Sequence, residues 1–107
     1  MSYVIEKGIQ QGFSRSLFHA YSTRGVYLID IGQLDKAIAD FDEAITLEPN
    51  NCRPYYYRGE AFYRMGKFDM AVADYEKAIA LYPPYWQAYV GRDQALHELR
   101  QRDKSRP

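Results

Sequence analysis

Few side chains in this sequence have the types and spacing that catalysis requires. The 107 residues include two histidines, His19 and His97, one cysteine, Cys52, and no glycine-rich loop of the kind that binds phosphate. Two histidines form an incomplete metal site, and a single cysteine has no second thiol for a disulfide or a zinc site. The sequence therefore predicts no enzyme, no metal site and no cofactor.

Carboxylates in two corresponding segments are a second group with chemical potential. They are Asp40, Asp42, Glu43, Asp74 and Glu76. Carboxylates at such spacing can hold a metal ion or act in acid–base catalysis. On the outward face of a helix they are far more often solvated, and the sequence favours that interpretation.

A cluster of tyrosines between two arginines is the most suggestive feature. Tyr56, Tyr57 and Tyr63 lie between Arg53 and Arg64, in a chain with eleven tyrosines. Tyrosine and arginine are enriched at binding hot spots, because rings bury large areas at low entropic cost. The cluster predicts an aromatic binding surface with cationic edges. The alternative, that Tyr56 and Tyr57 pack between adjacent helices, stays open.

Charge and hydropathy narrow the class of partner. Fourteen basic residues balance fourteen acidic ones, so no long-range attraction to nucleic acid or to an anionic membrane is expected. Tyrosines and arginines can stack on bases, which leaves RNA binding as a lesser alternative. The N-terminus lacks the features of a secretory signal, and no apolar stretch is long enough to insert into a membrane. We therefore expect a cytoplasmic protein.

These candidates lie on a sequence repeat of 34 residues. Residues 18–51 and 52–85 align with twelve identical pairs, which include Tyr21/Tyr55, Arg24/Arg58, Gly25/Gly59, Gly32/Gly66, Asp40/Asp74 and Pro49/Pro83. Apolar residues recur at spacings of three and four in each half of a unit, as on one face of a helix. Each unit is therefore predicted to be two helices, separated at Gly32 or Gly66 and ended by Pro49 or Pro83.

Glycines inside the first helix of each unit predict close packing. A glycine in a helix costs about 1 kcal/mol relative to alanine. Gly25 and Gly59 nevertheless occupy the same place in both units. We interpret this recurrence as a tight helix crossing that leaves no room for a larger side chain.

The repeat resembles the tetratricopeptide repeat (TPR), whose pattern has an aromatic, a leucine–glycine pair, an alanine, a phenylalanine and a closing proline. The first copy reads Tyr21, Arg24–Gly25, Leu28, Ala37, Phe41 and Pro49, and the second reads Tyr55, Arg58–Gly59, Phe62, Ala71, Tyr75 and Pro83. Arginine replaces leucine before the glycine in both copies, which we interpret as family drift. The resemblance implies an all-α fold of antiparallel helix–turn–helix repeats, stacked as a short right-handed superhelical solenoid.

The two ends of the chain flank these repeats. Residues 86–107 are predicted to be a capping helix, with Asp93 at the place of Gly25 and Gly59, followed by a basic tail. A charged residue at that place fits the absence of a second helix. We expect the tail to be a solvated, frayed end, with a contact for acidic partners as the alternative. Residues 1–17 are predicted to be either a short helix that covers the flank of the first repeat or an arm that packs on a second molecule. Because only two full repeats are present, a homo-oligomer that assembles through the repeat ends is an alternative.

In the family, the first helix of each unit lines a concave groove, and this implies the candidate binding residues. They are His19, Ser22, Thr23, Val26, Ile29 and Asp30 in the first unit, Arg53, Tyr56, Tyr57, Glu60, Tyr63 and Arg64 in the second, and Gln87, Val90, Gln94 and His97 in the capping helix. The sequence thus predicts a non-catalytic adaptor or scaffold that binds a protein or peptide partner.

One subfamily binds the acidic C-termini of chaperones through a clamp of lysines, asparagines and arginine. The matching places here hold Ser22, Val26, Tyr57, Gln87 and Gly91. Since the clamp residues are missing, the chaperone C-terminus is not the expected partner.

Overall fold

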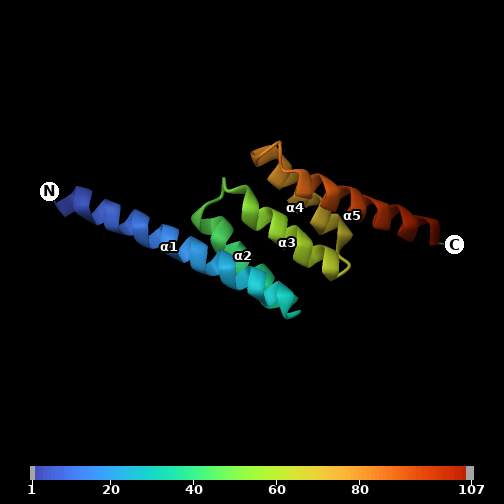
Figure 1. Cartoon of the computed structure of the whole chain (residues 1–107), viewed down its shortest axis with the longest axis horizontal. Coiled ribbons are helices and arrows are strands. Elements are labelled where there is room, and N and C mark those ends of the chain that lie inside the picture. The colour runs from blue at the N-terminus through green and yellow to red at the C-terminus, as the bar shows by residue number, and fades with distance from the viewer. Residues whose placement is uncertain (1, 106–107) are drawn as a thin grey trace.

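The chain is a row of antiparallel helices. The computed structural model describes the backbone of residues 2–105 and the side chains of residues 12–104. The helices are α1 (Ser2–Asp30), α2 (Leu34–Leu47), α3 (Cys52–Arg64), α4 (Phe68–Leu81) and α5 (Trp86–Ser105), and residues 2–105 contain no strand. Consecutive helices pack on each other, which gives an elongated body of 68 × 29 × 20 Å (Figure 1). The predicted all-α helical repeat solenoid is confirmed.

The turns inside each repeat form where the glycines predicted them. Gly32 and Gly66 adopt φ angles of 80° and 79°, a region that is costly for residues with a Cβ atom. The amides around them close the ends of α1 and α3, since Gln33 N donates to Leu28 O and Lys67 N donates to Phe62 O. α3 begins at a capped end, because the side chain of Asn51 accepts a hydrogen bond from Arg53 N.

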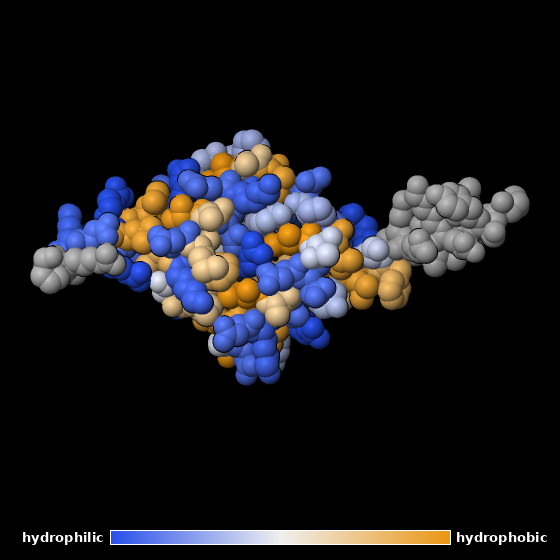
Figure 2. All heavy atoms as spheres, turned by 180° about the vertical axis from the view of Figure 1, so that it is seen from behind, coloured by the Kyte–Doolittle hydropathy of each residue, from blue (hydrophilic) through white to orange (hydrophobic). Residues whose placement is uncertain are grey.

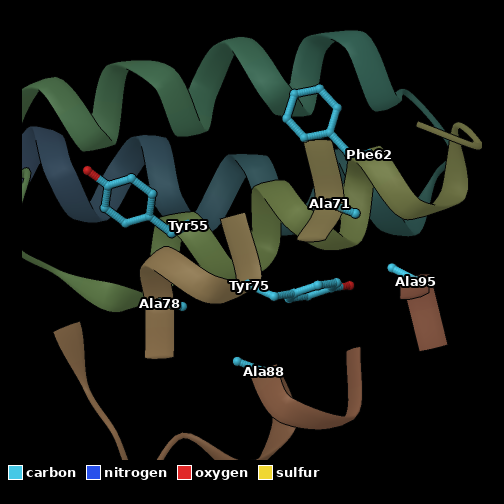
Figure 3. Close-up of a cluster of buried hydrophobic side chains, with 7 residues drawn as sticks. All are labelled: Tyr55, Phe62, Ala71, Tyr75, Ala78, Ala88 and Ala95. Carbon is cyan, nitrogen blue, oxygen red and sulfur yellow. The ribbon is translucent and has the colours of Figure 1, made fainter. Parts of the chain in front are cut away.

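Buried aromatic rings and alanines join the helices in two clusters. The first lies between α1, α2 and α3 and includes Ile29, Ala37, Phe41 and Ala61. The second lies between α3, α4 and α5 and consists of Tyr55, Phe62, Ala71, Tyr75, Ala78, Ala88 and Ala95. Figure 3 shows the ring of Tyr75 between the ribbon of α3 and the two alanines of α5, Ala88 and Ala95. The core therefore runs across the repeat boundary instead of closing within one unit.

The interior glycines pack against rings, as the sequence predicted. A Cβ atom on Gly25 would lie 2.7 Å from the ring of Phe41, and one on Gly59 would lie 3.1 Å from the ring of Tyr75. Gly91 of α5 approaches the same tyrosine from the other side, and its Cβ atom would lie 2.5 Å from Tyr75 Cζ. Tyr75 is completely buried. The ring of Tyr75 thus fits between α3 and α5 only because both helices have a glycine where they contact it.

The N-terminal segment differs from the expected short helix. α1 is a single helix of 29 residues that runs from Ser2 through the whole first helix of the first repeat. In Figure 1 its N-terminal part extends past the other helices instead of folding back over the first repeat. Gly8 and Gly12, which we expected to weaken a helix here, lie inside it.

The interpretation of the acidic residues as solvated is wrong for two of them. Asp40 and Asp74 are each only 5% exposed. Arg24 binds Asp40 through two hydrogen bonds of 2.7 Å, and Arg58 binds Asp74 through bonds of 2.8 and 2.7 Å. The arginine that departs from the family pattern is therefore the partner of a buried aspartate, in both repeats. It is a structural substitution and not drift.

The basic tail is helical up to Ser105. Within it, Arg102 donates a hydrogen bond to Gly66 O while its guanidinium lies 5.1 Å from the centre of the Phe68 ring. Arg106 lies outside the described residues. No helix within residues 2–105 is long and apolar enough to cross a membrane.

Candidate partner-binding groove

Two hollows lie side by side between the first helices of the units. The hollow between α1 and α3 has a volume of about 450 Å³ and is lined by Arg15, Phe18, His19, Ser22, Thr23, Val26, Asn51, Arg53, Pro54 and Tyr57. The hollow between the N-terminal ends of α3 and α5 has a volume of about 500 Å³ and is lined by Cys52, Arg53, Tyr57, Tyr82, Pro84, Tyr85, Trp86 and Gln87. Arg53 and Tyr57 line both hollows. We call this combined surface the groove.

Tyr57 forms the floor that the two hollows share. Its ring stacks on the buried ring of Phe41, with centroids 6.0 Å apart and an angle of 15° between the planes. Tyr56 meets Tyr57 edge to face at 5.1 Å. Because packed rings restrict the rotamers of Tyr57, its side chain has less freedom to lose when a partner binds.

The charges that line the groove have one sign. Arg15 and Arg53 are exposed, and neither hollow has a carboxylate among its lining residues. Arg15 lies 3.7 Å from Glu48, which offsets part of its charge. Arg53 is exposed, lines both hollows and so stands at their junction.

Seven of the candidate residues line the two hollows, namely His19, Ser22, Thr23, Val26, Arg53, Tyr57 and Gln87. His19 and Thr23 of α1 face Arg53 and Tyr57 of α3 across the first hollow, and His19 and Thr23 are exposed. Gln94 and His97 are exposed on α5, but they are not among the residues that line the two hollows.

The other predicted residues of α3 make contacts within the fold. Tyr56 packs against Tyr75 and Tyr85, Tyr63 packs against Phe68, and Arg64 donates a hydrogen bond to Ile29 O. Glu60 accepts a hydrogen bond from the hydroxyl of Tyr75. Ile29, another candidate, is buried at 4% exposure. For Tyr56 the structure matches the alternative of packing between adjacent helices.

Sequence reasoning missed the residues at the ends of the helices. Arg15, Phe18, Tyr82, Pro84, Tyr85 and Trp86 line the groove but were not among the candidates. Trp86 had a readable signal, because a tryptophan at the first position of a helix has little to pack against within that helix. In the structure it is 66% exposed.

Tyr56 and Cys52, beside the groove, stay neutral at physiological pH. Burial raises the pKa of Tyr56 to about 12, and burial also raises the pKa of the Cys52 thiol. A thiol with a raised pKa is a weak nucleophile at neutral pH, since the thiolate is the reactive form. Among residues 12–104, no group of three or more histidine, cysteine, aspartate or glutamate side chains is arranged to hold a metal ion.

An all-α repeat solenoid with a groove along its first helices is typical of helical-repeat proteins. Similarity to known families identifies which kind of helical repeat this is. One family profile described as "TPR repeat" matches residues 27–66, and a second described as "Tetratricopeptide repeat" matches residues 53–85. The chain belongs to the tetratricopeptide-repeat family. No curated protein matches it significantly.

Several solved structures share the fold. The first TPR domain of Spaghetti (RPAP3), bound to the HSP90 peptide SRMEEVD, is 27% identical over 80% of this chain and 68% of that one, with a TM-score of 0.78. The TPR domain of Arabidopsis OM64 is 27% identical over 82% of this chain and 73% of that one, with a TM-score of 0.79. MamA is 30% identical over 81% of this chain, which spans 48% of MamA, with a TM-score of 0.76.

Proposed function

We propose that the chain is a non-catalytic protein-interaction module that binds an extended peptide or a helix of a protein partner in the groove. The observation that carries the proposal is that two hollows meet at Arg53 and Tyr57, where an accessible cation stands beside a ring held in place from below. The similar TPR domain of Spaghetti holds a peptide, which supports the same use of the fold here.

The lining predicts the chemistry of the partner. Aromatic rings and aliphatic side chains favour an apolar anchor, which would fill one hollow. The absence of carboxylates from the lining favours an acidic side chain beside that anchor, paired with Arg53. We therefore expect an internal partner segment, without a terminal carboxylate to neutralise, in which an apolar or aromatic residue lies close to an aspartate or glutamate. Because the only thiol is unpaired, we place this binding in the reducing cytoplasm.

A peptide selection against the full chain tests the proposal. Peptides recovered from a random display library should share the expected apolar and acidic pair, with affinities measured by calorimetry. Arg53→Glu should weaken the binding of these peptides by at least about tenfold, because it reverses the charge that pairs with their acidic side chain. A tenfold change in the dissociation constant corresponds to about 1.4 kcal/mol. Lys36→Glu on α2, the same charge change at an exposed site away from the groove, should leave the affinity unchanged. Equal losses in both variants would show a nonspecific charge effect and contradict the groove.

The chaperone C-terminus is expected not to bind. In the structure Val26 and Tyr57 line the groove wall, and Gly91 brings only backbone to the ring of Tyr75. These places lack the cations that would pair with a terminal aspartate and its α-carboxylate. Calorimetry with the peptide SRMEEVD should show no heat of binding at about 100 µM, which sets the dissociation constant above that range. Micromolar binding would overturn this exclusion.

A further inference from the structure

One tyrosine–arginine contact is built into all three first helices. Arg24 lies over the ring of Tyr21, Arg58 over Tyr55 and Arg92 over Tyr89, at 5.7, 5.7 and 5.2 Å from the ring centres. These arginines are spaced by 34 residues, as the repeat requires. α5 therefore preserves the arginine position that the two complete repeats use for their buried ion pairs.

Arg92 lacks the aspartate that its two counterparts have. Arg24 and Arg58 bind Asp40 and Asp74, which come from the second helix of their own repeats. Within residues 2–105 no second helix follows α5. Arg92 instead reaches its neighbour Asp93 at 3.4 Å, the limit of a hydrogen bond, and the Asp93 side chain stays 68% exposed.

The side of α5 around this pair is open, and it mixes apolar side chains with the exposed charges of Arg100 and Asp103. Ala88, Gly91 and Ala95 are buried where α5 packs on the rest of the stack. Beside that contact Tyr89, Leu96 and Leu99 are only half-buried, and Trp86 at the start of the helix is 66% exposed. We call the surface formed by Trp86, Tyr89, Arg92, Asp93, Leu96 and Leu99 the α5 face. Seen from behind, the molecule has hydrophobic patches scattered among hydrophilic ones (Figure 2).

We propose that the α5 face binds the α5 face of a second copy of this chain, with the two helices antiparallel. The face is complementary to itself. When two copies are centred between Arg92 and Asp93, Arg92 of each copy meets Asp93 of the other, Tyr89 lies opposite Leu96, and Trp86 lies opposite Leu99. An isologous twofold contact requires this reciprocity.

The arrangement also accounts for Asp93 at a position where the complete repeats have glycine. In those repeats the carboxylate for the arginine comes from an antiparallel second helix, and the glycine makes room for its ring. In the dimer, α5 of the second copy takes the place of that helix, and Asp93 supplies the carboxylate that each Arg92 lacks. The glycine is not needed, because no ring has to enter there.

The dimer does not depend on the proposed function of the groove. Gln87 lines the groove. Because an α-helix turns by about 100° per residue, Gln87 points to a different side of α5 from Tyr89, Arg92 and Leu96. Trp86 borders both surfaces, since it also lines the second hollow. Arg92 and Asp93 line neither hollow, so variants at these two positions test self-association without altering the groove.

Sedimentation of the full chain over a concentration series tests the dimer. We expect the 12.5 kDa chain to form a dimer with a dissociation constant on the order of micromolar, as for a small interface. Arg92→Asp and Asp93→Arg each place like charges across the contact and should each weaken it by at least about tenfold. Their helical circular dichroism should match that of the wild type, because Asp93 is exposed and Arg92 has no partner in another helix.

Mixing the two variants is the decisive step. Arg92→Asp presents two acidic residues and Asp93→Arg presents two basic ones, so the mixture should form a heterodimer with an affinity within about threefold of the wild type. Loss of the dimer in Phe13→Ser/Ile31→Ser, two exposed apolar residues of α1, with dimers intact in both α5 variants, would overturn the proposal. A wild-type chain that stays monomeric up to about 200 µM would also overturn it.

Discussion

Arg58→Leu is expected to lower the free energy of unfolding by about 3 kcal/mol at neutral pH, although it restores the leucine of the family pattern. Arg58 donates to both oxygens of Asp74 and also to Asp42, and its side chain is only 23% exposed. Removing it leaves the buried carboxylate of Asp74 without its cation. Urea denaturation followed by circular dichroism measures the loss.

The double variant Arg58→Leu/Asp74→Ala separates the ion pair from general packing. If the loss comes from the orphaned carboxylate, removing that carboxylate as well should recover most of it, and the double-mutant cycle should give a coupling of about 1.5 kcal/mol or more. Arg24→Leu is the matched control in the first repeat. Because Arg24 is 63% exposed and water can reach its site, its removal should cost less.

The pH dependence of Arg58→Leu follows from Asp74. Burial already raises the pKa of Asp74, and Arg58 opposes that shift, so the variant should have a still higher pKa at this carboxyl group. A folded state with the higher pKa binds a proton more tightly than the unfolded chain, so its stability rises as the pH falls through that pKa. The deficit of the variant relative to wild type should therefore shrink between about pH 7 and about pH 5. A deficit that is constant over this range would show that Asp74 is not the cause.

Gly91→Ala is expected to destabilise the fold by about 2 kcal/mol, although alanine is the better helix former by about 1 kcal/mol. The new Cβ atom would lie 2.5 Å from Tyr75 Cζ, and Gly59 closes the other side of the ring. The ring is completely buried and its hydroxyl is bound to Glu60, so it has nowhere to move. Thermal and urea denaturation both report the loss.

Gly12→Ala provides the matched control for the glycine. It lies in α1 with nothing within 4 Å of its would-be Cβ atom, so alanine there should stabilise by up to about 1 kcal/mol. Adding Tyr75→Leu to Gly91→Ala should reduce the cost of the alanine, since a smaller side chain leaves room for it. A stabilised Gly91→Ala variant would mean that α5 does not pack on Tyr75 as the structure describes.

The repeats were predictable from the sequence because geometry demands specific residues at their boundaries. Gly32 and Gly66 occupy turns with positive φ, and Gly25 and Gly59 contact rings, so the sequence carried these constraints twice. The continuity of α1 was not predictable in the same way. Gly8 and Gly12 lower the helix propensity of this segment, and the sequence therefore favoured a short helix. Propensity is weak evidence, and the helix in fact begins at Ser2 and continues through both glycines.

The ion pairs were missed although their signal was present. Arg24/Arg58 and Asp40/Asp74 are each identical between the repeats and are 16 residues apart, and a buried aspartate requires a cation or hydrogen-bond donors as partners. The arginine and the aspartate of each ion pair were interpreted separately, as family drift and as solvated carboxylates. For the groove, position in a first helix identified His19, Thr23, Arg53 and Tyr57, but it did not show that Tyr56 packs against Tyr75 and Tyr85. That outcome depends on the neighbouring helices, which helical periodicity alone does not describe.

Chemical-shift mapping of a bound peptide tests the central claim most directly. The isotope-labelled chain of 12.5 kDa is small enough for amide spectra, and a peptide from the display selection supplies the ligand. The largest shifts should fall on the amides of His19, Thr23, Arg53, Tyr57 and Gln87, which border the two hollows. Shifts confined to the α2–α4 side or to the α5 face, with the groove amides unmoved, would contradict the claim that the groove binds the partner.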